Sequence, residues 1–421
     1  MKKLLFILLL FLINISVTTS FAQENTNPGL KELISSAIIV NSKLKPLEYE
    51  KLIEQSKINQ FNKQPAPSVE VMQDKIPFSF MNAGEFILSY SQPLKLFGKT
   101  DASENYYNYR ALKPELMKEE LQKDLIKEVK DNYFLLYQNE RKLSTNNIQQ
   151  EIIKSITKSI EITYSVGKGS QSDILKSNSE LQKLLYEDIE LKSEKKIILN
   201  NLRTITGLNL PQDFKTSNIG AFVNTNISID DTLKLQNQII EHNLEFKYLN
   251  YEKTLNNLER NINELERKPD LTFKTGYMYM SGVDEHAFQI SAMIDLPFMP
   301  WNSKRIDAMV QENEYMDKQI DSKYNSALTY MKSELRNKMS MIDAQREKMK
   351  FIKEITIPQL EQTLNSNLVS YQTGTLDYMN VVDTYRMLRE NDFQLIDEET
   401  KYLLYLSELE RLISAELIKI N

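Results

Sequence analysis

The sequence predicts a mainly α-helical protein with a small β part, in which one long helical hairpin occurs twice. The chain has only 10 glycines in 421 residues, far below the usual share of ~7%, so we expect few turns and long helices. A Tyr-x-x-Gly turn occurs at Tyr164 and again at Tyr371. Two short segments, about 67–94 and 270–297, replace helical spacing with alternation of apolar and polar residues.

The two turns indicate an internal duplication. Tyr164 to Gly167 and Tyr371 to Gly374 lie 207 positions apart. Glycine ends a helix readily because it tolerates positive φ, and a Ser, Thr or Asp soon after it can cap the next helix. Each turn therefore predicts the tip of a helical hairpin. Apolar residues keep the same offset downstream, in the pairs Leu181 and Leu388, Leu199 and Leu406, Leu202 and Leu409, and Ile205 and Leu412.

Residues 1–22 have the pattern of a secretory signal peptide. A basic start at Lys2 and Lys3 precedes an apolar run from Leu4 to Ile13, and residues 20–22 form a small-residue cleavage site. A retained membrane helix is the weaker alternative, because the apolar run is too short to span a bilayer. The chain has no cysteine, which excludes disulfides, an acylated cysteine anchor and zinc sites built on thiolates.

The charge and the motifs exclude several classes of function. The formal net charge is −6, and it becomes −8 when Lys2 and Lys3 leave with the signal peptide. Nucleic-acid binding requires a basic face, so we expect no nucleic-acid partner. The sequence contains no HExxH, P-loop, nucleophile elbow or dinucleotide fingerprint. We therefore expect no enzyme activity, and no catalytic residue, cofactor or bound metal.

The duplication divides the mature chain into two repeats joined by a linker at 211–230. The first repeat spans 23–210 and holds an N-terminal helix or helix pair, a β-hairpin at about 67–94 and a long helix pair at 100–208, with Pro114 as a kink or the true start. The second repeat spans 231–421 and holds a helix at 231–266, a β-hairpin at 270–297 and a long helix pair at 303–420, interrupted at Pro358.

The predicted strands suit a membrane. About ten residues tilted by about 40° rise roughly 25 Å, the height of the apolar band of outer-membrane barrels. Four strands are too few to close a barrel, and open strand edges are not tolerated in lipid. Three copies would supply 12 strands and a tube of long helices below them. The sequence therefore favours four transmembrane strands per chain in a homotrimer in contact with outer-membrane lipid.

Taken together, these features resemble the TolC-type outer-membrane efflux channels over essentially the whole mature chain. The resemblance rests on the duplication, both Tyr-x-x-Gly tips, the motifs Gln92 to Leu94 and Phe97 to Lys99 after a strand, and Lys268 to Asp270 before the third strand. It implies a trimeric tunnel in the outer membrane of a Gram-negative bacterium, with a helical barrel in the periplasm. It also implies a periplasmic adaptor (membrane fusion protein) and an inner-membrane pump as partners, and export of toxic compounds, metal ions or proteins.

The resemblance also implies a gate. The family places acidic residues six and nine positions after the second tip glycine, where this chain has Asn380 and Asp383. The first position departs from the family pattern, so Asp377 is a further candidate, with an N-terminal helix cap as its alternative role. Tyr371 is a candidate hydrogen-bonding residue of the gate at the tip, and plain packing is its favoured alternative role. The resemblance assigns adaptor docking to the tips, at Tyr164, Gly167, Gly169, Ser170, Gly374 and Thr375.

Alternatives within and outside this class remain open. A channel for type I protein secretion is one, and a non-pore periplasmic coiled-coil adaptor is another. An adaptor has no need of strands with one apolar face. The segment from Pro269 to Pro297 resembles that of heavy-metal (CusC-like) members of the family. Methionines near this second strand pair suit soft ions such as Cu(I) as cargo. Their alternative role is to fill gaps in packing. They are Met278, Met280, Met293 and Met299.

Overall fold

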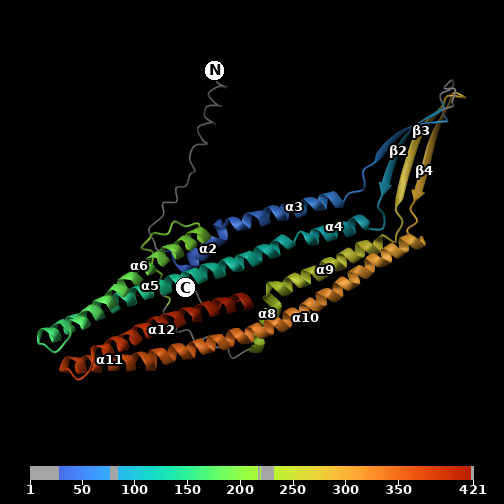
Figure 1. Ribbon diagram of the computed structural model, residues 1–421. Helices are drawn as coiled ribbons and strands as arrows, with labels where there is room; N and C mark the ends of the chain where they lie inside the picture. Colours follow the sequence, from blue (N-terminus) through green and yellow to red (C-terminus); the bar gives the residue numbers. More distant parts are fainter. Residues whose placement is uncertain (1–27, 76–83, 217–218, 220–231, 419–421) are drawn as a thin grey trace, which may run out of the picture.

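The computed structural model describes residues 28–75, 84–216, 219 and 232–418. The predicted signal peptide at 1–22 and most of the predicted linker at 211–230 lie outside this range. The described chain is elongated, with the strands at one end and two helical tips at the other (Figure 1). The predicted fold class, mainly α with a small antiparallel β part, is confirmed.

The first half of the chain contains a helix pair, two strands and a long hairpin. Its elements are α2 (Leu30–Val40), a 3₁₀ turn η1 (Ser42–Leu44), α3 (Lys45–Phe61), β1 (Ser68–Asp74), β2 (Glu85–Leu94), α4 (Lys99–Arg110), α5 (Lys113–Ser165) and α6 (Gln171–Thr206). Pro114 lies in the first turn of α5, where its missing N–H costs no helical hydrogen bond. It therefore marks the start of that helix, as one of the two predicted roles.

The second half follows the same order. Its elements are α8 (Thr232–His242), α9 (Leu244–Leu265), β3 (Leu271–Met280), β4 (Glu285–Ile294), α10 (Pro300–Phe351), a π-helical turn η2 (Ile352–Thr356), α11 (Ile357–Thr373) and α12 (Tyr378–Ile413). The predicted interruption at Pro358 is this π turn. Proline would clash with the carbonyl four residues earlier, and the wider turn before Pro358 relieves that clash without ending the helix.

Two helix boundaries differ from the prediction. The expected single helix at 231–266 is broken at Asn243, which caps α9 by accepting a hydrogen bond from the Glu245 N–H. The helix expected to reach residue 420 ends at Ile413. There the Glu410 carboxylate accepts hydrogen bonds from the backbone N–H groups of Leu417 (2.7 Å) and Ile418 (2.6 Å). These contacts turn the chain back on α12.

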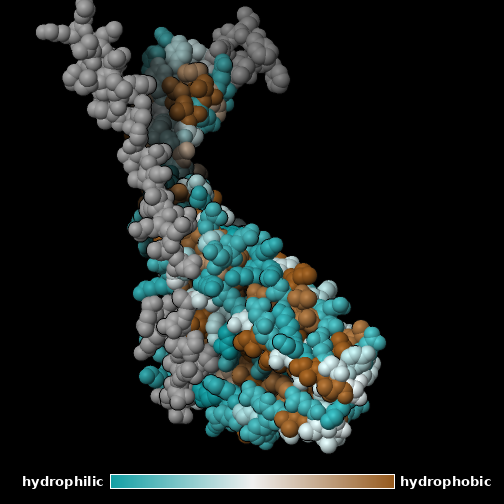
Figure 2. Space-filling view, turned by 90° about the vertical axis from the view of Figure 1, so that its left-hand side faces the viewer, coloured by the Kyte–Doolittle hydropathy of each residue, from teal (hydrophilic) through white to brown (hydrophobic). Residues whose placement is uncertain are grey.

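The four strands form one antiparallel sheet in the order β1-β2-β3-β4. The register places Val71, Leu88, Tyr277 and Phe288 side by side in one row. The neighbouring row, on the opposite face, contains Glu70, Ser89, Gly276 and Gln289. The sheet therefore has one apolar and one polar face, and within the described residues β1 and β4 have no partner along their outer edges. Figure 2 shows hydrophobic residues gathered in the strand region above a largely hydrophilic helical body.

Most of the apolar core lies at the waist, between the sheet and the tips. There α2 and α6 pack on α5, α5 packs on α12, and α12 packs on α10. Val129, Phe134, Leu403 and Leu406 are fully buried at these contacts. A smaller separate cluster of buried apolar residues lies near the tips.

Candidate functional site at the helical tips

The first tip connects α5 to α6 through a tight, capped turn. Gly167 has φ +74°, a left-handed conformation that strains other residues. Ser170 caps α6 by accepting a hydrogen bond from the Ser172 N–H (3.0 Å), and the Asp173 carboxylate accepts one from the Ser170 N–H (3.3 Å). This reciprocal capping box fixes where the return helix begins. Tyr164, just before the turn, is exposed.

The second tip connects α11 to α12 in the same way. Gly374 has φ +79°, and the Thr375 N–H donates to the Ser370 carbonyl oxygen (2.9 Å). Asp377 is the N-cap of α12 and accepts a hydrogen bond from the Met379 N–H (3.1 Å). The structure thus gives Asp377 the capping role that the sequence left open as its alternative.

The two tips contact each other through Tyr371. Its hydroxyl donates to the Asp173 carboxylate (3.4 Å), and a side chain added at Gly169 would lie 3.2 Å from that hydroxyl oxygen. Tyr371 is 5% exposed, and its ring lies 5.7 Å from that of Tyr378. Burial, with a further contribution from Asp173, raises the pKa of Tyr371 to about 12. The hydroxyl therefore stays protonated and able to donate at neutral pH.

A second polar contact joins the hairpins beside Tyr371. The Gln372 side-chain amide donates to the Ser159 hydroxyl (2.9 Å), linking α11 to α5. Tyr371 and Gln372 thus both connect the second hairpin to the first.

The two positions at which the resemblance predicts acids lie on the exposed side of α12. Asn380 is exposed, and its side-chain amide points back to the Asp377 carbonyl oxygen (3.5 Å). The Asp383 carboxylate is also exposed and forms an ion pair with Arg386 one turn later (3.3 Å). At this tip, therefore, one expected acid is an amide and the other is next to a guanidinium.

Arg386 also reaches the first hairpin. Its guanidinium donates to the Glu180 carboxylate on α6 (2.6 Å), and Lys183 contacts the same carboxylate (2.8 Å). Burial favours the neutral form of Glu180, but the hydrogen bonds from Arg386 and Lys183 outweigh it, so its pKa lies below the usual range.

Sequence reasoning missed both members of this pair. Glu180 and Arg386 are 206 positions apart, and no local pattern brings them together. The one available signal was that a basic residue follows Asp383 by one helical turn, on the same face.

The methionines do not form one thioether site. Met278 and Met280 share the polar face of β3, but Met293 lies opposite Thr272, at the other end of the strand. Met299 lies outside the sheet, at the start of α10. Within the described residues, no group of three or more His, Cys, Asp or Glu side chains could hold a metal ion.

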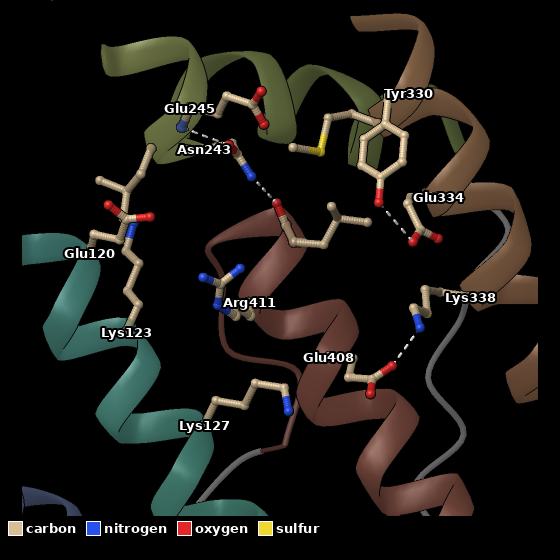
Figure 3. Close-up of a pocket in the computed structure, with 13 residues that line it drawn as sticks. Glu120, Lys123, Lys127, Asn243, Glu245, Tyr330, Glu334, Lys338, Glu408 and Arg411 are labelled. Atoms are coloured by element: carbon tan, nitrogen blue, oxygen red, sulfur yellow. Dashed lines mark hydrogen bonds and ion pairs between the residues drawn. The ribbon is translucent and has the colours of Figure 1, made fainter. Parts of the chain in front are cut away.

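A cavity of about 320 Å³ lies at the waist, where α5, α9, α10 and α12 meet (Figure 3). Its basic residues have acidic partners within the chain: for example, Lys338 pairs with Glu408, and Arg411 with Asp124. Asn243 lies in its wall and donates to the Leu412 carbonyl oxygen (2.9 Å). The cavity therefore lies at the break between α8 and α9. Because its basic side chains are already paired within the chain, we assign it no ligand.

This architecture is similar to that of known proteins in structure but not in sequence. The sequence matches no family model and no curated protein. Among solved structures, that of CusC has a TM-score of 0.76 at 14% identity, and the match covers 92% of both chains. That structure was described in terms of folding and transmembrane channel formation. The chain has the fold of the outer-membrane channels.

Two further structures with this channel fold are also similar. The outer-membrane channel OprN has a TM-score of 0.72 at 12% identity, covering 92% of this chain and 90% of its own. The CmeC outer-membrane channel of Campylobacter jejuni has a TM-score of 0.69 at 14% identity, covering 91% of this chain and 85% of its own. Among the described helices, none is long and apolar enough to cross a membrane.

Proposed function

We propose that this protein is the outer-membrane channel of a tripartite efflux system. In this proposal it is a homotrimeric tunnel of a Gram-negative bacterium, with its sheet in the outer membrane and its helices in the periplasm. It exports small toxic compounds or metal ions and catalyses no reaction. The channel fold and the resemblance to TolC-type channels support this proposal. One structural feature also favours it over a periplasmic adaptor.

That feature is the sheet, which is apolar on one face and polar on the other. On the apolar face Phe288 is 85% exposed, Ile290 74% and Val69 69%. Such a surface is unfavourable in water but matches a lipid face, while the opposite face suits an aqueous lumen. A periplasmic coiled-coil adaptor has no use for this sheet, so the channel is favoured over that alternative.

The free edges of the sheet support assembly with further copies. Unpaired backbone groups are not tolerated in lipid, so β1 of one copy must pair with β4 of the next. Because the order β1-β2-β3-β4 alternates in direction, this contact is antiparallel and can repeat around a ring. Three copies supply 12 strands, above the ~8 needed for closure.

The helical layer also has two free edges. The α6 edge exposes Leu175, Tyr186 and Ile189, and the opposite edge at α10 and α11 exposes Phe351 and Val369. In a ring of copies, the first edge of one chain faces the second edge of the next. Burial of both stripes would then contribute to trimer stability.

The tips are the proposed gate and docking region. We assign Tyr371, Asp377, Asn380 and Asp383 to the periplasmic entrance, with Tyr371 and Asp377 acting through hairpin contact and helix capping. The turns then offer the surface for a periplasmic adaptor, which in turn binds an inner-membrane pump. The docking residues are Tyr164, Gly167, Gly169, Ser170, Gly374 and Thr375.

The cargo is the least constrained part of the proposal. The separated methionines give no support to a dedicated thioether site for Cu(I) within one chain, so small toxic compounds remain the broader assignment. Type I protein secretion requires the same tunnel and differs only in the pump and the cargo.

Purification from outer membranes in detergent, with mass measurement and planar-bilayer recording, tests this function. We expect three copies per particle and discrete conductance steps. A monomer that is extracted without detergent and does not conduct would instead support the adaptor alternative.

A further inference from the structure

The exposed face of α12 at the tunnel entrance carries balanced charge. Asp383, Arg386 and Glu390 lie on this face at successive turns of the helix, and Arg389 lies beside them. The Arg386 guanidinium is 3.3 Å from the Asp383 carboxylate and 2.6 Å from that of Glu180. The acid expected to dominate the entrance therefore has a permanent positive charge next to it.

The groove between α6 and α12 continues this balance above the tip. Four basic residues line it together with four acidic ones; the basic residues are Lys183, Arg386, Arg389 and Lys401. Arg389 approaches the Glu187 carboxylate across the groove (3.8 Å). The side chains that line the groove itself are therefore balanced in charge.

We propose that Arg386 sets the charge selectivity of the tunnel entrance, by neutralising Asp383 and so admitting neutral and anionic compounds as readily as cations. This inference rests on the proposed channel function and on Asp383 facing the lumen. A ring of unpaired carboxylates would concentrate cations and repel anions. Here, three copies of Asp383 would be matched by three copies of Arg386, and Asn380 adds no charge.

Arg386 is well placed for this role because it lies one turn after Asp383 on the same helix. Glu180 is 3% exposed and binds the guanidinium from α6, while 44% of the Arg386 side chain remains exposed. A lysine would bring the charge but not two separate hydrogen-bonding edges for two carboxylates. Arg386 therefore keeps a positive charge next to Asp383 at the entrance.

The test is single-channel recording of the intact protein, with the K⁺/Cl⁻ permeability ratio measured from reversal potentials in a KCl gradient. For the wild type we expect a ratio close to one. For Arg386→Gln, which exposes the Asp383 ring, we expect the ratio to rise by about tenfold. The same variant should also acquire block by hexaamminecobalt(III) added from the side of the tips.

Three further variants separate charge from folding. Arg386→Gln leaves Glu180 without its main partner, so the double variant Arg386→Gln/Glu180→Gln removes that buried carboxylate and should show the same cation selectivity. Arg386→Gln/Asp383→Asn should return the ratio to that of the wild type. Arg386→Lys should stay near the wild type because the charge is kept.

The outcomes distinguish this inference from the channel function. If the K⁺/Cl⁻ permeability ratio is the same in the wild type, in Arg386→Gln and in Arg386→Gln/Glu180→Gln, the role of Arg386 is overturned and the channel function stands. A wild-type protein that forms no conducting particle would overturn the channel function, and this inference with it.

Discussion

The waist and the tips of the helical body are stabilised in different ways. At the waist, Lys130 and Glu410 form an ion pair (2.7 Å) whose side chains are 4% and 8% exposed, inside the larger apolar core. At the tips, Arg386 pairs with Glu180 while 44% of its side chain is exposed, beside a smaller core. A buried pair is costly to break, whereas a partly hydrated pair can separate and re-form. This difference agrees with the proposal that the tips form the gate while the waist stays rigid.

The largest effect is expected at the waist. Lys130→Met leaves the Glu410 carboxylate buried without its counter-charge, so the free energy of unfolding should fall by about 3–5 kcal/mol. Denaturant unfolding followed by circular dichroism measures it. Lys43, whose side chain is 61% exposed and 3.9 Å from Glu128, is the matched control, and Lys43→Met should cost less than about 1 kcal/mol. Equal losses in the two variants would contradict the contrast.

A smaller effect is expected from the tip pair. Glu180→Gln removes the charge that Arg386 binds on α6, and a partly exposed contact of this kind contributes about 1 kcal/mol. The ratio of open to closed channel should therefore rise by about fivefold in bilayer recordings. Charge selectivity should not change, because Asp383 and Arg386 both remain. A lower open probability would place the pair in the open state instead.

Substitutions at Tyr371 distinguish the contribution of its hydrogen bond from that of its packing at the tip. Tyr371→Phe removes the 3.4 Å contact with Asp173 but keeps the buried ring, so the open-to-closed ratio should rise only about twofold. Tyr164, the equivalent residue of the first tip, is exposed, and Tyr164→Phe should leave gating unchanged. An effect of Tyr371→Phe as large as that of Tyr371→Ala would mean that packing contributes little.

The smallest effect concerns pH. Asp392 on α12 accepts a hydrogen bond from Gln149 on α5 (2.7 Å), and burial raises the pKa of its carboxyl to about 6. A raised carboxyl pKa means that the folded state favours the protonated form. Stability from this group is therefore present below about pH 4 and is lost as pH rises through 6.

Asp392→Asn should accordingly stabilise the protein at pH 7.5. Because the carboxyl is partly exposed, we expect a gain of only about 1–2 °C in Tm, which disappears at pH 4. Differential scanning calorimetry at both values checks it, and a gain that is equal at pH 4 and 7.5 would exclude titration of Asp392 as the cause.

The sequence predicted those parts of the fold that have strong local signals. Alternation predicted both strand pairs, because a strand with one wet face must alternate. The repeat offset predicted equivalent core positions, and Leu199 and Leu406 are indeed both buried. The sequence also offered an N-terminal helix cap as the alternative role of Asp377, and in the structure Asp377 is the N-cap of α12.

The remaining features depend on contacts distant in sequence. The break at Asn243 is stabilised by its bond to Leu412, 169 positions away, and the end of α12 by the Glu410 carboxylate. The pairing of Arg386 with Glu180 likewise has no local signature. The gating role of Asp383 and the docking role of the tip turns remain predictions.

The absence of cysteine makes the pairing of β1 with β4 of a neighbouring copy directly testable. Val71 in β1 and Phe288, Ile290 and Ala292 in β4 lie on the same face of the sheet. Val71→Cys would be combined in turn with a cysteine at each of the three positions in β4. Within one chain, two strands separate β1 from β4, so at ~4.8 Å per strand spacing they lie too far apart for a disulfide.

Any disulfide between these positions must therefore join two copies. We predict that one of the three combinations, oxidised in isolated membranes, gives a ladder on a denaturing gel that stops at three chains. Val71→Cys with Gln289→Cys, on opposite faces of the sheet, should give none. A ladder ending at two chains, or no product in any combination, would contradict the closed trimeric channel.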